Sequence, residues 1–172
     1  MILKNNSLLI RIFIFSCILL ATTACGVYKL MDVSIADNVK TFRVNFIENK
    51  ARYINPQLSQ QLTDKLRQKI IGQTRLSQVN TGDSHYEISG TITDYSISTS
   101  AISAQQTTAN RLSVTVHIIL FKRNENKTEE FDVSRNYEFD ARQSLTQAEA
   151  ALKDEMVRTL VDEIFTKIFS NW

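Results

Sequence analysis

The chain has 172 residues, of which 43% are hydrophobic and 22% charged, and its formal charge is +2. This composition excludes collagen-like, low-complexity and disordered chains, and the length predicts one domain. A small excess of basic residues favours an anionic partner, such as nucleic acid or a membrane, only if the charge lies on the folded part.

The first 24 residues have the features of an export signal. Lys4 and Arg11 precede the apolar run Ile12–Ala21, which is too short to span a bilayer well. These two residues are the only charges before residue 25, so the rest of the chain holds 18 basic and 18 acidic residues. The part expected to fold is therefore neutral, and we expect no nucleic-acid partner.

Cys25 follows small residues that end in Ala24, and it resembles the modified cysteine of a bacterial lipobox. Thr22 occupies the position where a lipobox usually has leucine. Because Cys17 lies within the apolar run, cleavage would leave Cys25 alone, without a disulfide partner. We expect Cys25 to carry acyl chains, such as palmitate, that anchor it to a membrane. The alternative is an ordinary signal peptide followed by an unmodified exported cysteine.

Gly26 bears on the destination of such a lipoprotein. By analogy with the sorting of enteric lipoproteins, the absence of an acidic residue at this position favours the outer membrane. Residues 25–40 show no clear period and are predicted to be a lipidated tether. We therefore expect residues 41–172 to form a single domain.

The first predicted elements of that domain are a strand and a helix. Residues 41–47 alternate, which is typical of a half-buried strand with Phe42, Val44 and Phe46 on the buried face. Asn55 and Pro56 then suit the cap and first position of a helix that is expected to end near Gly72. The apolar stripe of this helix is Leu58, Leu62, Leu66 and Ile70.

Three consecutive antiparallel strands are predicted next. They cover residues 86–97, residues 111–121, and a third segment with Phe131, Val133, Tyr137 and Phe139 on one face. A shift in the apolar phase of the first predicts a bulge near Thr93–Asp94, and residues 124–127 form the second turn. One interpretation of the link over residues 98–110 is that it continues the hairpin beyond the core.

A second helix is predicted from Ser144, which forms a capping box with Gln147. Its apolar face is Leu145, Ala148, Leu152, Met156, Leu160, Ile164, Phe165 and Ile168. The order strand, helix, three strands, helix predicts an α+β fold. We expect two layers: a four-stranded, mostly antiparallel sheet with two helices packed on one face.

The sequence offers little catalytic chemistry. Asp83, His85 and Glu87 could share one strand face and bind a divalent metal, but strand-edge polar alternation explains them more simply. His117 is predicted to lie some distance away, and we find no phosphate loop, nucleophile elbow or metalloprotease motif. We therefore expect no enzyme, no metal and no cofactor.

Basic residues carry the remaining functional signal. The candidate ligand contacts are Arg111, Lys122, Arg123 and Lys127, with Lys50 and Arg52 before the first helix. Arginine and lysine bind phosphate groups well. The competing interpretation, that each of them lies on an ordinary solvated surface, is the simpler one for every residue taken singly.

The arrangement of short motifs resembles the LptE family of lipopolysaccharide-assembly lipoproteins, in its Bacteroidota type. The motifs are Cys25-Gly26-x-Tyr28, Asn55-Pro56-x-Leu58-Ser59-Gln60-x-Leu62-Thr63-x-x-Leu66, Thr74-x-Leu76, Gly90-x-Ile92-x-x-Tyr95, Asn110-Arg111-Leu112-x-Val114-x-Val116, Ile164-Phe165 and Asn171-Trp172. The resemblance implies a non-enzymatic protein of the outer membrane. Such a protein plugs the LptD β-barrel, helps that barrel assemble, and contacts lipopolysaccharide during its transport to the outer leaflet.

Two other classes of function stay open. One is a lipoprotein adaptor or scaffold for another cell-envelope machine. The other is a metal-dependent or hydrolytic envelope enzyme that uses Asp83, His85 and Glu87.

Overall fold

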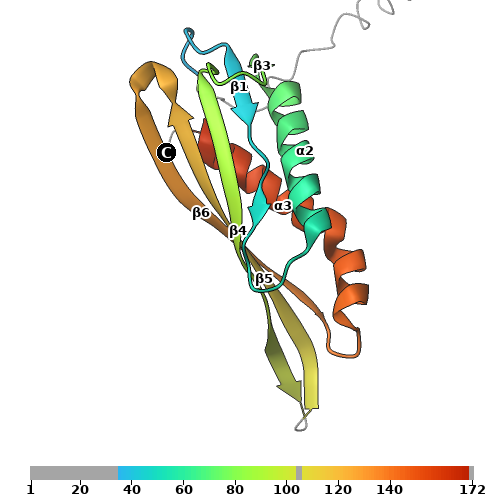
Figure 1. The fold of residues 1–172 in the computed structure, drawn as a ribbon. Helices are drawn as coiled ribbons and strands as arrows, with labels where there is room; N and C mark the ends of the chain where they lie inside the picture. Colours follow the sequence, from blue (N-terminus) through green and yellow to red (C-terminus); the bar gives the residue numbers. More distant parts are fainter. Residues whose placement is uncertain (1–34, 104–105, 171–172) are drawn as a thin grey trace, which may run out of the picture. The chain divides into compact units, whose positions relative to one another are not determined.

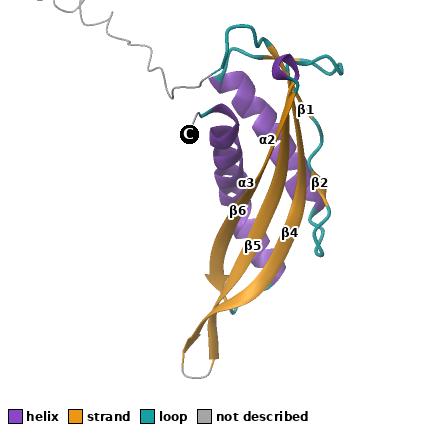
Figure 2. Cartoon of the chain, turned by 90° about the vertical axis from the view of Figure 1, so that its left-hand side faces the viewer, coloured by secondary structure: helices purple, strands orange, loops and turns teal. Residues whose placement is uncertain are grey.

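Two helices pack on one face of a single twisted sheet (Figures 1 and 2). The computed structural model describes residues 35–103 and 106–170, so the expected signal peptide, Cys25 and most of the expected tether lie outside the described residues. The strands are β1 (Thr41–Val44), β2 (Glu48–Asn49), β3 (Ser77–Gln78), β4 (Tyr86–Ser103), β5 (Gln106–Lys122) and β6 (Lys127–Asp140). The helices are α2 (Pro56–Gln73), the short 3-10 turn Arg123–Glu125, and α3 (Leu145–Phe169).

The sheet is mixed and has six strands in the described residues, in the order β3-β1-β4-β5-β6, with β2 also paired to β4. The antiparallel β4–β5–β6 unit is present as expected, but β1 and β2 run parallel to β4, and β3 parallel to β1. The α+β class with two helices is confirmed, and the sheet differs in detail from the expected one: it has six strands among the residues described where four were expected, and it is mixed, because the short pairings of β1, β2 and β3 are parallel. The two-residue strands β2 and β3 are too short to show a period, and the α2 crossover makes β1 and β3 parallel.

The β4–β5 hairpin continues past the helices, as one interpretation of the sequence had it. Its register runs from Tyr86 opposite Lys122 to Ser103 opposite Gln106, and Figure 1 shows its far end extending beyond the other elements. The register shifts between Ile92 and Asp94, so the expected bulge is confirmed.

The core lies between the sheet and the helices, and most of it follows the predicted periods. All four residues of the predicted α2 stripe are buried, as are the five alternating positions of β5. Both caps are also confirmed: the Asn55 side chain accepts a hydrogen bond from the Leu58 amide, and Ser144 and Gln147 form a reciprocal capping box. Helix α2 continues one residue past Gly72, and Thr74 caps its end.

A break between β1 and β2 changes the face that each residue presents. Val44 lies opposite Ile88 and Glu48 lies opposite Thr91, so this edge of the sheet holds one residue more than β4 does. Ile47 is consequently buried, at 1% exposed, while Phe46 is 50% exposed. The prediction that Phe46 lies on the buried face is therefore wrong, because an inserted residue reverses the alternation.

Ile47 packs directly on Gly90, and this close approach predicts opposite effects for two glycine substitutions. A Cβ atom on Gly90 would lie 3.0 Å from Ile118 Cδ1 and 3.1 Å from Ile47 Cγ1, whereas one on Gly72 would have no neighbour within 4 Å. We expect Gly90→Val to lower the free energy of unfolding by about 1–3 kcal/mol. The control, Gly72→Ala at the end of α2, should raise it by about 0.5–1 kcal/mol. Urea unfolding measures both, and equal shifts in the same direction would contradict this packing.

Candidate binding surfaces

The sheet face opposite the helices is polar, and its side chains bond to one another across the strands. Between β5 and β6, Ser113 contacts Asn136 at 2.8 Å, and Thr115 contacts Ser134 at 2.9 Å. At the ends of this row, His117 lies 2.8 Å from Asp132, and Arg111 lies 3.2 Å from Glu138. These cross-strand pairs make the outer face hydrophilic but locally balanced in charge.

The structure brings three of the four candidate basic residues together at one end of the sheet. Lys122 and Lys127 each donate to Glu129 at 2.8 Å, and these bonds lower the pKa of Glu129. The Arg123 guanidinium donates to the Ser84 carbonyl at 2.9 Å and to the Gly82 carbonyl. These three, with Glu129, are called the sheet-end cluster below. Much of their hydrogen-bonding capacity is used within the chain.

Arg111 does not belong to that cluster. It is eleven residues from Lys122 along β5, which corresponds to roughly 37 Å in an extended strand. Its guanidinium contacts Glu138 on β6. The four candidates therefore could not contact one small phosphate group together, although a long ligand or a protein wall could reach both places.

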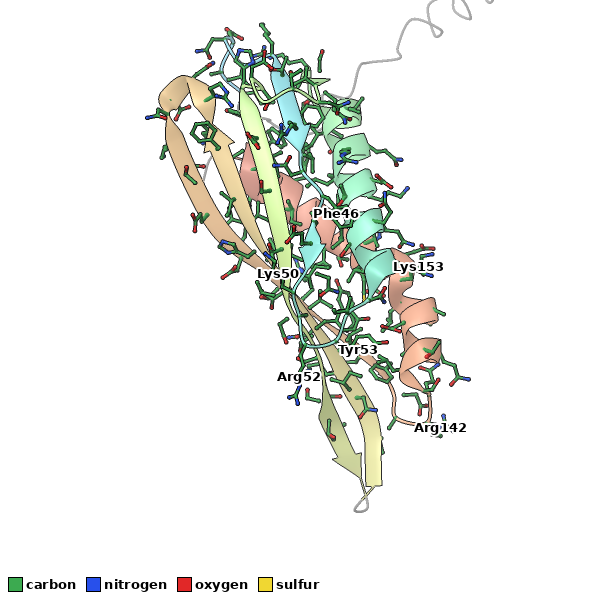
Figure 3. The ribbon with its side chains drawn as sticks, viewed as in Figure 1. Phe46, Lys50, Arg52, Tyr53, Arg142 and Lys153 are labelled. Atoms are coloured by element: carbon green, nitrogen blue, oxygen red, sulfur yellow. The ribbon has the colours of Figure 1, made fainter. Side chains whose placement is uncertain are left out.

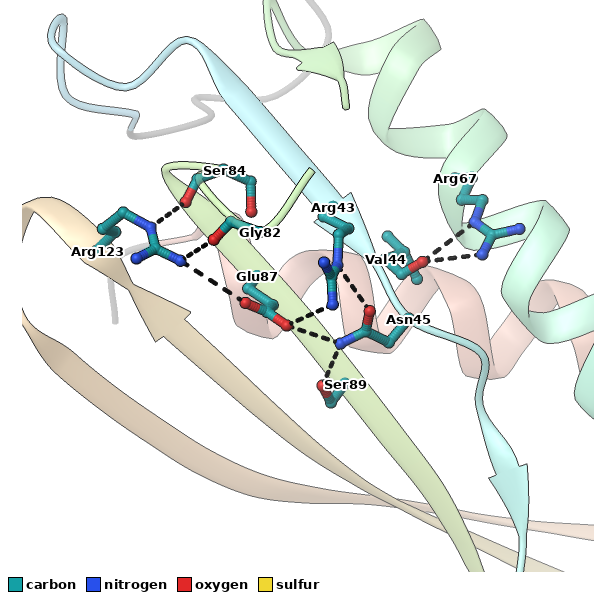
Figure 4. A network of polar contacts seen from close by, with 9 residues as sticks. All are labelled: Arg43, Val44, Asn45, Arg67, Gly82, Ser84, Glu87, Ser89 and Arg123. Carbon is teal, nitrogen blue, oxygen red and sulfur yellow. Dashed lines mark hydrogen bonds and ion pairs between the residues drawn. The ribbon is translucent and has the colours of Figure 1, made fainter. Parts of the chain in front are cut away.

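Asp83, His85 and Glu87 each contact different partners, and Figure 4 shows those of Glu87. Glu87 accepts hydrogen bonds from Arg43 at 3.0 Å and from Asn45 at 2.9 Å, and its other oxygen lies 3.9 Å from Arg123. His85 contacts Thr41 at 2.6 Å, and a hydrogen bond from Thr81 lowers the pKa of Asp83. Within the described ranges, no three His, Cys, Asp or Glu side chains are arranged to hold a metal ion.

The connection from β1 to α2 exposes apolar residues next to Lys50 and Arg52, two basic residues already noted in the sequence. Phe46 is 50% exposed, Tyr53 43% and Ile54 62%, and Lys50 and Arg52 lie beside them in the chain. These five residues are called the rim below, and Figure 3 labels four of them. Exposed aromatic and aliphatic side chains next to cations are typical of surfaces that contact amphiphilic anions or proteins.

Partly buried polar groups fix the position of Tyr53 in the rim. The Tyr53 ring stacks on Tyr95, with ring centres 5.4 Å apart. Glu149 of α3 accepts a hydrogen bond from the Tyr95 hydroxyl at 2.6 Å and from the Asn55 side chain at 3.0 Å. Burial and this bond to Glu149 raise the pKa of Tyr95, so the phenol stays protonated and donates. The cap of α2, β4 and α3 thus jointly fix the ring on which Tyr53 stacks.

A cleft of about 340 Å³ lies between the rim and the first turns of the two helices. Tyr53 and Ile54 form one wall, Leu58 and Met156 lie deeper, and Lys153 stands on the α3 side. Glu149 accepts hydrogen bonds from Tyr95 and Asn55 at Oε1, and among the described residues it forms no ion pair with Lys153 four residues later on α3. In the part of the chain that the structure describes, the ion pairs include neither Lys153 nor Arg52.

The sheet-end cluster predicts a pH dependence of stability. The folded-state pKa of Glu129 is lowered from 4.5 by its bonds to Lys122 and Lys127. The contribution of ionised Glu129 to the free energy of unfolding is therefore fully present above about pH 4.5. It is lost as the pH falls through the lower pKa that Glu129 has in the folded chain. Since Glu129 is partly exposed, we expect about 1 kcal/mol at most.

The measurement compares Glu129→Gln with the unchanged chain in urea unfolding at pH 7 and pH 3. The difference in free energy of unfolding between the two proteins should be largest at pH 7 and shrink at pH 3. Glu155→Gln, at an exposed position of α3, serves as the control and should show almost no difference at either pH. A Glu129→Gln difference that is equal at both values would contradict the assignment.

Comparison with known proteins places the fold in a recognised group. The model of the family LptE, described as lipopolysaccharide-assembly, matches residues 39–168, which span all the strands and nearly all of α3. No curated protein sequence matches the chain. Among the described helices, none is long and apolar enough to cross a membrane.

Several solved structures share the fold at low identity. A putative neuraminyllactose-binding hemagglutinin homolog from Helicobacter pylori is 8% identical, with a TM-score of 0.58 over 83% of this chain and 90% of that chain. A minor lipoprotein from Acinetobacter baumannii is 18% identical, with a TM-score of 0.51 over 75% of this chain and 91% of that chain. At these identities the likeness concerns the fold alone.

Proposed function

Because the chain belongs to the LptE family of non-enzymatic lipopolysaccharide-assembly lipoproteins, we propose that it acts on an LptD-type outer-membrane β-barrel, as a plug and an assembly partner. In this proposal acylated Cys25 anchors the chain to the outer membrane, and the domain faces the periplasm or the barrel lumen. The observation that carries the proposal is the family match over nearly the whole described fold, residues 39–168.

The outer face of the sheet supports a position inside a barrel. The lumens of wide outer-membrane barrels are polar, so a plug needs a hydrophilic surface without a large unbalanced charge. The cross-strand pairs from Arg111–Glu138 to His117–Asp132 provide such a surface. The neutral balance of 18 basic and 18 acidic residues after position 24 is consistent with it.

The rim and the sheet-end cluster are the proposed contacts with lipopolysaccharide, which combines phosphate groups with acyl chains. Arg52 and Lys153 are exposed cations outside the ion pairs of the described residues, and Tyr53 and Ile54 offer apolar surface next to them. Lys122, Arg123, Lys127 and Arg111 remain candidate contacts. We expect their contribution to be smaller, because a ligand would compete with Glu129, Glu138 and backbone carbonyls for the same donors.

Capture of the full-length, tagged chain from detergent-solubilised envelopes tests the choice of partner. We expect a large outer-membrane β-barrel to co-purify, because plugging requires a lasting complex. Cys25→Ser, which cannot be acylated, should move the chain out of the membrane fraction and reduce this capture. If a periplasmic synthase is recovered in place of a barrel, the adaptor interpretation is correct and the plug interpretation is wrong.

Binding of purified lipopolysaccharide tests the rim. Arg52→Glu combined with Tyr53→Ser should weaken binding about tenfold, because one cation and one exposed ring are lost together. Lys65→Glu reverses an exposed cation of α2 outside the rim and is the matched control, expected to bind nearly normally. Lys122→Gln with Lys127→Gln should have an intermediate effect. Equal affinities for all these variants would remove both surfaces as lipopolysaccharide contacts.

A further inference from the structure

The two long edges of the sheet differ sharply in charge. Strand β6 carries seven charged residues among its fourteen, which protects an edge from pairing with other strands. In contrast, the sixteen residues from Tyr95 to Asn110 include no charged side chain. The β4 edge over Tyr95–Thr99 is called the uncharged edge below.

No strand of the described chain pairs with the uncharged edge. Strand β2 ends at Asn49, opposite Ile92, and the Lys50 amide makes the last backbone bond, to the Ile92 carbonyl at 2.9 Å. After the bulge, β4 pairs with β5 without a shift from Asp94 to Thr99. The backbone N–H and C=O groups of successive residues point alternately to the two sides of a strand. In this register, the N–H and C=O groups of Tyr95, Ile97 and Thr99 point away from β5.

These outward groups form a short template for another strand. Ile97 is also 44% exposed, so an added strand would cover an apolar side chain as well as satisfy backbone donors and acceptors. The segment contains neither glycine nor proline to weaken the pairing. The edge thus has the backbone geometry of strand addition and lacks the charges that usually prevent it.

We propose that the uncharged edge accepts an extended, uncharged segment of the barrel partner as an additional strand. The identity of the partner rests on the proposed function, whereas the edge itself is argued from β4. A second copy paired edge to edge over these few residues would bury far less than the roughly 1,000 Å² that a stable interface needs. If the barrel already binds the chain elsewhere, one of its segments is present at the edge at a high effective concentration. A small additional interface is then sufficient for strand pairing.

Proline substitution separates strand addition from other contacts. Ile97→Pro removes an outward N–H while leaving the β4–β5 ladder its bonds. Thr128→Pro makes the same change at an outward N–H of the charged β6 edge and is the matched control. We expect Ile97→Pro to reduce capture of the barrel about tenfold and Thr128→Pro to leave it nearly unchanged. Thermal unfolding checks that Ile97→Pro folds. Ile97→Lys is the second test variant: it keeps the backbone donor but adds a charge to the edge, and it should also reduce capture of the barrel.

Photo-crosslinking from positions 97 and 99 of the full chain identifies the neighbour directly. A crosslink to an extended segment of the barrel supports the inference. Capture of the barrel at normal levels by folded Ile97→Pro and by Ile97→Lys would overturn it while leaving the proposed function intact. If the unchanged chain captures no barrel, both fail together. A crosslink to a second copy, or to another part of the same chain, would also overturn strand addition.

Discussion

The structure depends on the way α2 satisfies the backbone where β1 and β2 separate. The Arg67 guanidinium donates to the Val44 carbonyl at 2.9 Å, and the Thr63 hydroxyl accepts a hydrogen bond from the Ile47 amide at 3.0 Å. Without these partners the break would leave unpaired polar groups beside the core, which is costly. The helix thus makes an interrupted edge strand stable, and the extra residue that it accommodates turns Phe46 outward.

The same break connects the core to the proposed binding surface. Ile47 packs on Gly90, and the chain then pairs with β4 again as β2, which lies between Phe46 and the other residues of the rim. Asn55 then caps α2 with one side-chain atom and contacts Glu149 of α3 with another. The rim residues from Lys50 to Ile54 therefore lie on a short connection that is held at Ile47 and at Asn55, which limits the loss of conformational freedom on binding.

Much of the fold could be predicted from the sequence, since α2, α3 and the β4–β5–β6 unit have clear periods and recognisable caps. The parallel edge could not, because β2 and β3 have two residues each and their pairing depends on where α2 packs. The exposure of Phe46 could not be predicted for a related reason. Phe46 continues the alternation of Phe42 and Val44 in the sequence, and the change of phase depends on an inserted residue whose backbone is satisfied by α2.

Charge placement, more than total charge, distinguishes the surfaces of this protein. At the sheet end, Lys122 and Lys127 share Glu129, so these cations mainly stabilise the β5–β6 turn. Arg52 in the rim and Lys153 on the α3 side of the adjoining cleft have no such partner among the described residues, so an external anion meets less competition there. The uncharged edge differs from both, because pairing with another strand is favoured where the edge carries no charge, whereas binding of a phosphate requires cations. A neutral domain thus presents a proposed glycolipid surface and a proposed strand-binding edge that adjoin at one point, because the ring of Tyr53 in the rim stacks on the ring of Tyr95 in the uncharged edge.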